Sequence, residues 1–174
     1  QDYSQAAGWY RKAIAAGNLL AVGNLSKLML HGLGMPEDPD GAFQMIQEAA
    51  DQGNIFAANT LGCRYFRGEG TPVDITKAAD YFEIAAKAGL AEAQVNMGNV
   101  YFYGDGRPVN SQMAVYWYEQ AASRNHPGAL YLLANLNFNG EHLPKDELKA
   151  YTLYSRAADL GDVLAQYMLA VCFD

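Results

Sequence analysis

The chain has 174 residues, of which 51% are hydrophobic, a composition that suits a continuous core and excludes a disordered protein. Its 12 basic and 19 acidic side chains give a formal net charge of −7, and the basic residues form no cluster, so we expect no nucleic-acid partner. No apolar stretch approaches the roughly 18 residues that cross a bilayer, so we expect no membrane span.

The sequence repeats every 36 residues without one insertion or deletion. Glycine holds one series of places, with Asn125 in the fourth of them, and alanine and proline hold others. The clearest series are Gly17, Gly53, Gly89 and Gly161; Ala13, Ala49, Ala85, Ala121 and Ala157; and Pro36, Pro72, Pro108 and Pro144. A fixed period of this length predicts stacked units that bury their apolar faces against their neighbours.

We expect one all-α solenoid domain over residues 1–174, built from about ten helices in antiparallel pairs. A half repeat over 1–18 precedes four full repeats and a half repeat over 163–174. The full repeats are predicted at 19–54, 55–90, 91–126 and 127–162.

The repeat at 55–90 illustrates the predicted elements. Its first helix covers 55–67, with one apolar face for packing. The following Gly68-Glu69-Gly70 has no third glycine and no preceding strand, so it predicts a helix end with positive φ rather than a phosphate loop. A second helix starts after a capping residue, and this series is Asp2, Asp38, Asp74, Asn110 and Asp146.

The two tryptophans, Trp9 and Trp117, fall on the packed stripe of second helices, so we expect both to be core residues, although Trp9 on the first helix would leave apolar surface open at that end. The chain opens with a second-type helix over 3–16 and closes with a first-type helix over 163–174. Neither resembles a polar capping helix, so we expect a longer solenoid, or ends that pack on something else, including another copy of the chain.

The cysteines, Cys63 and Cys172, lie about three repeats apart, too far for a disulfide if stacked units advance by roughly 10 Å. A secreted form stapled by disulfides is therefore disfavoured. The three histidines lie at non-equivalent places, so no metal site is expected. His126 occupies a helix-start place shared with Asn18, Asn54 and Asp162, so we expect it either to cap a helix or to be exposed at the surface. No motif predicts catalytic or cofactor-binding residues.

The side of the first helix opposite its packed face varies between repeats and is the predicted binding surface, which we call the binding stripe. Asparagine amides there both donate and accept hydrogen bonds, so they suit a peptide backbone, although Asn24 and Asn96 are equally suited to bonding a neighbouring turn. Phe56 and Tyr103 are the expected apolar anchors. The binding stripe comprises Asn24, Lys27, Phe56, Thr60, Cys63, Arg67, Glu92, Asn96, Asn99, Tyr103, Asn135 and Asn139.

From Ala57 to Gly89 the residues read Ala-x-x-x-Leu-Gly-x-x-Tyr-x-x-Gly-x-Gly, then x-Pro-x-Asp, then Lys-Ala-x-x-Tyr-Phe-x-x-Ala-Ala-x-x-Gly. Similar strings run over 93–125, 21–53 and 129–161. The pattern resembles the Sel-one-like repeat, a relative of the tetratricopeptide repeat. The resemblance implies a right-handed superhelix of helix pairs that acts as an adaptor in protein complexes, and its abundance in bacteria suggests a bacterial cytoplasmic or periplasmic protein.

We therefore expect a non-enzymatic scaffold that binds a peptide or another protein in its concave groove. Two alternatives remain. The apolar ends suit self-assembly into a homo-oligomer. A cysteine-rich branch of the resembled family has been linked to penicillin binding or hydrolysis, but this chain lacks the regular cysteine pairs of that branch.

Overall fold

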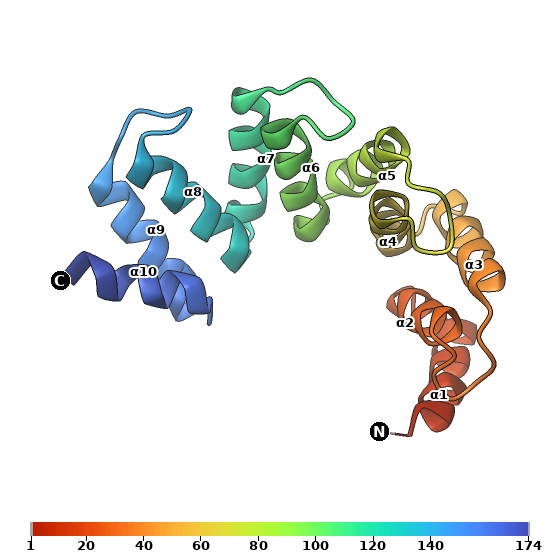
Figure 1. The fold of residues 1–174 in the computed structure, drawn as a ribbon. Coiled ribbons are helices and arrows are strands. Elements are labelled where there is room, and N and C mark those ends of the chain that lie inside the picture. Colours follow the sequence, from red (N-terminus) through yellow and green to blue (C-terminus); the bar gives the residue numbers. More distant parts are fainter. Residues whose placement is uncertain (1, 174) are drawn as a thin grey trace. The chain divides into compact units, whose positions relative to one another are not determined.

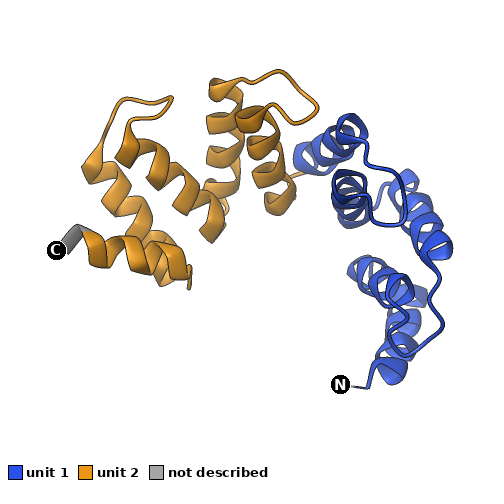
Figure 2. Cartoon of the chain, in the orientation of Figure 1, with its two compact units in different colours: residues 1–88 blue, residues 89–174 orange. Residues whose placement is uncertain are grey.

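The computed structural model describes residues 2–173, with side chains to residue 171, and shows ten α-helices and no strand in that part of the chain (Figure 1). The helices divide between two compact units, Gln1–Ala88 and Gly89–Asp174 (Figure 2).

Unit 1 contains five helices, and each packs against the next along the chain. The first helix of one repeat also packs against the first helix of the following repeat, α2 against α4. The five helices are α1 (Tyr3–Ala15), α2 (Leu20–Leu30), α3 (Pro39–Asp51), α4 (Ile55–Arg67) and α5 (Ile75–Lys87).

Unit 2 is likewise a run of consecutive helices that pack pairwise, with α6 against α7, α7 against α8, α8 against α9 and α9 against α10. Its core is centred on buried residues of α7, α8 and α9, including Tyr118, Leu130 and Tyr154. The helices are α6 (Ala91–Tyr103), α7 (Ser111–Ser123), α8 (Pro127–Asn139), α9 (Glu147–Asp159) and α10 (Val163–Phe173).

The predicted helix starts are confirmed. At each second helix the capping side chain accepts a hydrogen bond from the backbone N–H three residues ahead, at 2.9–3.0 Å. His126 also caps its helix, with Nδ1 3.3 Å from the backbone nitrogen of Ala129. Caps of this kind stabilise a helix by about 1 kcal/mol each, so the repeat fixes its own boundaries locally.

The predicted helix ends are confirmed as well. Gly68, Gly104 and Gly140 end α4, α6 and α8 in the left-handed region, with φ of 72°, 84° and 72°. Among the described residues, two other than glycine share this conformation, Asn125 (φ 58°) and His142 (φ 61°). Both stand where the other repeats place glycine, so the backbone follows the period even where the residue does not.

The prediction for the tryptophans is half right. Trp117 is buried, but Trp9 is 65% exposed, with Lys12 Nζ 4.4 Å from the centre of its ring. The difference follows from the neighbours of each helix, because α7 packs against both α6 and α8, whereas α1 packs mainly against α2.

Candidate binding surfaces

In unit 1 the binding stripe lies on α2 and α4. Asn24, Lys27 and Arg67 are exposed, and Phe56 is half-buried. Arg67 lies 3.5 Å from Glu69, but this ion pair is open to solvent and therefore weak. This part of the stripe thus offers two cationic side chains, an amide and an aromatic edge.

Thr60 and Cys63, the other two stripe residues of unit 1, are half-buried. The Thr60 hydroxyl donates to the carbonyl oxygen of Phe56 at 2.9 Å. It also lies where α2 and α4 approach each other, since a Cβ on Gly23 would be 3.3 Å from Thr60 Oγ1. Thr60 therefore contributes to helix packing, and its hydroxyl proton is already engaged.

In unit 2 the stripe asparagine Asn99 pairs with a core tyrosine. The Tyr118 hydroxyl, from α7, donates to Asn99 Oδ1 on α6 at 2.8 Å. Tyr118 is only 2% exposed, and its burial, with a smaller contribution from Tyr103, raises the pKa of its phenol. The ring packs directly on Gly98, where a Cβ would be 2.2 Å from Tyr118 Cε1.

The following repeat, 127–162, contains an equivalent asparagine–tyrosine pair. The Tyr154 hydroxyl, from α9, donates to Asn135 Oδ1 on α8 at 2.6 Å, and both pairs span 19 residues of sequence. The two complete equivalent pairs in unit 1 carry neither group, because Lys27 pairs in the register with Ile46, and Cys63 pairs with Phe82. Wherever both places of the pair lie within one complete repeat, the amide and the hydroxyl therefore occur together or are both absent.

Sequence reasoning placed both tyrosines in the core but missed their bond to the stripe. The available signal was this co-occurrence, an asparagine in the stripe wherever a tyrosine follows 19 residues later. For Asn24 and Asn96 the sequence suits a hydrogen bond to a neighbouring turn as well as one to a ligand. Asn99 likewise forms a hydrogen bond within the chain, but its partner is the Tyr118 side chain and not a turn.

The remaining stripe residues of unit 2 are Glu92, Tyr103 and Asn139, which are exposed, and Asn96, which is half-buried. Tyr103 is 67% exposed, and its ring meets the edge of Phe102 with ring centres 4.9 Å apart. It is the most accessible aromatic side chain of the stripe.

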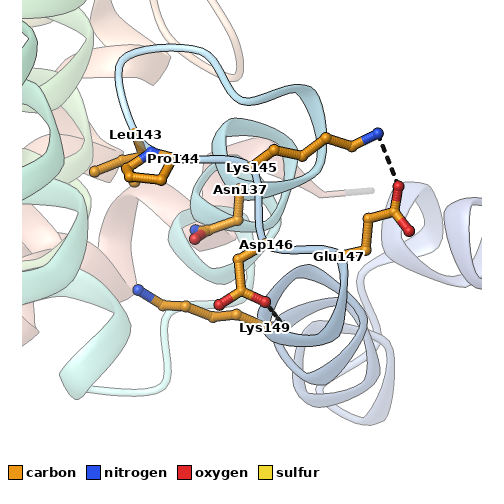
Figure 3. Close-up of a pocket in the computed structure, with 7 residues that line it drawn as sticks. All are labelled: Asn137, Leu143, Pro144, Lys145, Asp146, Glu147 and Lys149. Atoms are coloured by element: carbon orange, nitrogen blue, oxygen red, sulfur yellow. Dashed lines mark hydrogen bonds and ion pairs between the residues drawn. The ribbon is translucent and has the colours of Figure 1, made fainter.

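Hollows also lie outside the stripe in the described part of the chain. One of about 350 Å³ in unit 1 is lined mainly by apolar residues of α1, α2 and α3, with Met45 and Glu48 among them. Another, of about 600 Å³, lies between the loop after α8 and the start of α9 (Figure 3). It is open, and Lys145 beside it is already paired with Glu147 at 2.7 Å, which Figure 3 marks.

The described residues contain no group of three or more His, Cys, Asp or Glu side chains that could hold a metal ion. No helix in the described part of the chain has both the length and the apolar character needed to cross a membrane. Cys172 has no described side chain, so its predicted separation from Cys63 lies outside the described part.

Arg64 is a buried residue that the sequence pattern did not single out. It is 2% exposed on α4, where the equivalent places hold the buried apolar residues Leu28, Val100 and Leu136. Its Nη2 donates to Ser26 Oγ at 3.1 Å, whereas Nη1 is buried with no hydrogen-bond partner. Burial lowers the pKa of its guanidinium, and the charge of Glu69 opposes this shift.

Comparison with known proteins identifies the repeat. The model of the Sel1 repeat family matches residues 1–18, 20–54, 55–90, 91–126, 127–162 and 163–174. A search of curated proteins found no match.

Among solved structures, the chain is similar to c5321, a protective antigen of uropathogenic Escherichia coli with an SLR fold, at 30% identity and a TM-score of 0.82. That match covers 91% of this chain but 34% of the antigen, so the chain spans about a third of its length. A Sel1 repeat protein from Oxalobacter formigenes matches at 29% identity and a TM-score of 0.85, covering 96% of this chain and 68% of that one.

Cysteine rich protein B of Helicobacter pylori matches at 20% identity and a TM-score of 0.61, over 76% of this chain and 96% of that one, which shows a shared fold. The consecutive helix pairs within each unit and these likenesses confirm the predicted all-α repeat solenoid. The matches of the family model extend from the first residue to the last. The chain therefore belongs to the Sel1 repeat family.

Proposed function

We propose that the chain is a non-enzymatic adaptor that binds a peptide or another protein through the binding stripe. The observation that carries the proposal is the accessibility of polar and aromatic stripe residues beside a periodic core. Asn24, Lys27 and Arg67 in unit 1 and Glu92, Tyr103 and Asn139 in unit 2 are exposed, on helices whose other faces are packed. Helical repeat proteins are scaffolds whose variable surface residues meet their partners.

The two parts of the stripe differ in chemistry. Lys27 and Arg67 favour acidic groups on a partner of unit 1. In unit 2 the amides and Tyr103 favour hydrogen bonding and an apolar contact, and Glu92 is the one charged residue among its stripe positions. A partner that contacts both parts would carry acidic groups on the segment that meets unit 1, and hydrogen-bonding and apolar groups on the segment that meets unit 2.

The test starts from partners captured by the immobilised chain from source-cell lysate, identified by mass spectrometry and then purified. Calorimetry then compares the wild type with Tyr103→Ala and with Lys27→Glu. Because both residues are exposed, we expect stability within about 0.5 kcal/mol of the wild type. We expect at least one of the two variants to bind about tenfold more weakly, as an anchor or a complementary charge would.

Tyr116→Ala is the matched control, because Tyr116 is 46% exposed but lies on α7, outside the stripe. A partner that loses affinity for Tyr116→Ala and keeps it for both stripe variants would contradict the assignment of the binding surface. Turnover of nitrocefin by the purified chain would contradict the absence of enzymatic activity.

A second candidate function is self-association, which α10 favours. Val163, Leu164, Tyr167 and Val171 are 45–73% exposed on this one helix. Light scattering over a hundredfold range of concentration tests it, and an unchanging monomer mass would exclude it. A Tyr167→Glu variant should lower the mass of any assembly formed through this face.

A further inference from the structure

We propose that Tyr118 and Tyr154 hold the amides of Asn99 and Asn135 as hydrogen-bond donors for the main-chain carbonyls of an extended peptide. The inference rests on the proposed function, because it assigns the chemistry of the ligand to the unit 2 part of the binding stripe. It adds two positioning residues, the tyrosines, to the surface residues that contact the ligand.

The first step is the orientation of the amides. A primary amide has one acceptor oxygen and one NH₂ group with two donors. The oxygen of Asn99 already accepts from Tyr118 at 2.8 Å, and that of Asn135 accepts from Tyr154 at 2.6 Å. Each tyrosine therefore leaves the Nδ2 hydrogens of its asparagine for another acceptor.

The tyrosines hold this orientation firmly. The Tyr118 ring is 2% exposed and the Tyr154 ring is fully buried, so neither ring can turn away without disrupting the core. A buried hydroxyl that loses its acceptor costs about 1–3 kcal/mol, which keeps the amide oxygen turned toward it. Asn99 and Asn135 themselves are only half-buried. The donors are thus held in place by the core while the amides stay accessible.

The second step is the kind of acceptor. A helical partner has its backbone carbonyls bonded internally except in the last turn, so it offers few acceptors to a row of donors. An extended peptide leaves every carbonyl available, and main-chain hydrogen bonds give it affinity that depends little on sequence. Two donors of the same type on consecutive repeats therefore fit an extended segment better than a helix.

The decisive variant is aspartate, which has the shape of asparagine. In Asn99→Asp and Asn135→Asp the carboxylate still accepts from the tyrosine, so folding is preserved. The outward NH₂ is replaced by an acceptor oxygen that repels a carbonyl. An alanine variant would also remove the acceptor for the buried hydroxyl, so a loss of binding could not be separated from a loss of stability.

The probe is the tightest peptide selected from a random 12-residue phage library on the immobilised intact chain, then synthesised. Its affinity is measured by calorimetry for the wild type, the Asn99→Asp/Asn135→Asp double variant and the Tyr118→Phe/Tyr154→Phe double variant. Gln112→Glu, an exposed site on α7, controls for added charge when compared with Asn99→Asp alone. Circular dichroism reports whether the bound peptide becomes helical.

We expect the aspartate double variant to bind at least about tenfold more weakly with an unchanged melting temperature, since each lost hydrogen bond contributes about 1 kcal/mol and each replacement adds repulsion. The phenylalanine double variant, with amides free to flip, should lose about threefold or more. The bound peptide should gain no helicity, and the side-chain NH₂ signals of Asn99 and Asn135 should shift in NMR spectra on binding.

Unchanged affinity in the aspartate double variant, a helical bound peptide, or no enriched peptide at all would each overturn the inference. These results remain distinct from failure of the proposed function, which is judged by Tyr103→Ala and Lys27→Glu on a captured protein. If Tyr103→Ala abolishes binding of the captured partner while the aspartate double variant binds the selected peptide normally, the proposed function stands and the inference is wrong.

Discussion

Replacing Arg64 by methionine should stabilise unit 1. The guanidinium is 2% exposed, Nη1 has no hydrogen-bond partner, and the one bond from Nη2 ends on the hydroxyl of Ser26. Apolar residues that replace buried charges of this kind are neutral or stabilising by about 1–4 kcal/mol. Ser26 keeps its own bond to the carbonyl oxygen of Gly23 at 2.8 Å, so the substitution leaves no buried hydroxyl unsatisfied.

The bond from Arg64 to Ser26 is itself favourable, so we expect a net gain of about 1–3 kcal/mol in the free energy of unfolding. Methionine suits the site because its unbranched chain follows the path of the arginine stem. Urea unfolding followed by far-UV circular dichroism measures the change. In a chain of this length, each kcal/mol corresponds to about 2–4 °C in melting temperature.

Arg67→Met is the matched control, one turn further along α4. The Arg67 side chain is 64% exposed and its ion pair with Glu69 is weak, so we expect a change within about 0.5 kcal/mol. Glu69→Gln should destabilise the wild type more than the Arg64→Met variant, because the charge of Glu69 favours the buried guanidinium. A loss of more than about 1 kcal/mol in Arg64→Met alone would refute the reasoning, since it would mean that the buried charge is well compensated.

Three further predictions concern pH and backbone conformation. Hydrogen bonds from backbone N–H groups at the start of α5 lower the pKa of Asp74, so the stability that its carboxylate contributes is lost as the pH falls below about 3.9. The free energy of unfolding of Asp74→Asn, measured in urea, should therefore depend less on pH in that range. Burial raises the pKa of Tyr118, so the free energy of unfolding falls as the pH rises above about 10. In the same urea assay, Tyr118→Phe should lose less of its free energy of unfolding over that pH range. Gly34→Ala should destabilise by about 2–4 kcal/mol in urea unfolding, because it combines a φ of +71° with a Cβ 2.4 Å from the Tyr3 carbonyl carbon. Gly17→Ala, with a φ of +83° and nothing within 4 Å, should lose only about 1–2 kcal/mol, and equal losses would contradict the clash.

The fold was predictable because its determinants are local and repeated. The cap at Asp74 and the left-handed turn at Gly68 each involve residues within a few positions of one another, and each recurs every 36 residues. Even His142, which breaks the glycine pattern, adopts the positive φ that the register demands. A local signal seen several times in one chain needs little knowledge of tertiary structure.

The site was predictable only in outline, because its chemistry depends on pairs distant in sequence. The stripe positions follow from helical periodicity, but the partner of Asn99 lies on the next helix and that of Arg64 lies 38 residues away on α2. The exposure of Trp9 likewise depends on which helices cover it. Periodicity indicates which side of a helix faces the core, but not which atoms meet there.

Each amide and the tyrosine that orients it lie within one 36-residue segment, Asn99 with Tyr118 and Asn135 with Tyr154. A single gene duplication therefore copies both members of the pair together. Recombination at the repeat boundary would add or remove a complete asparagine–tyrosine pair in one event, without a second mutation to restore the core. The number of such pairs can therefore change in whole steps, and the packing of each tyrosine is inherited together with the asparagine that it contacts.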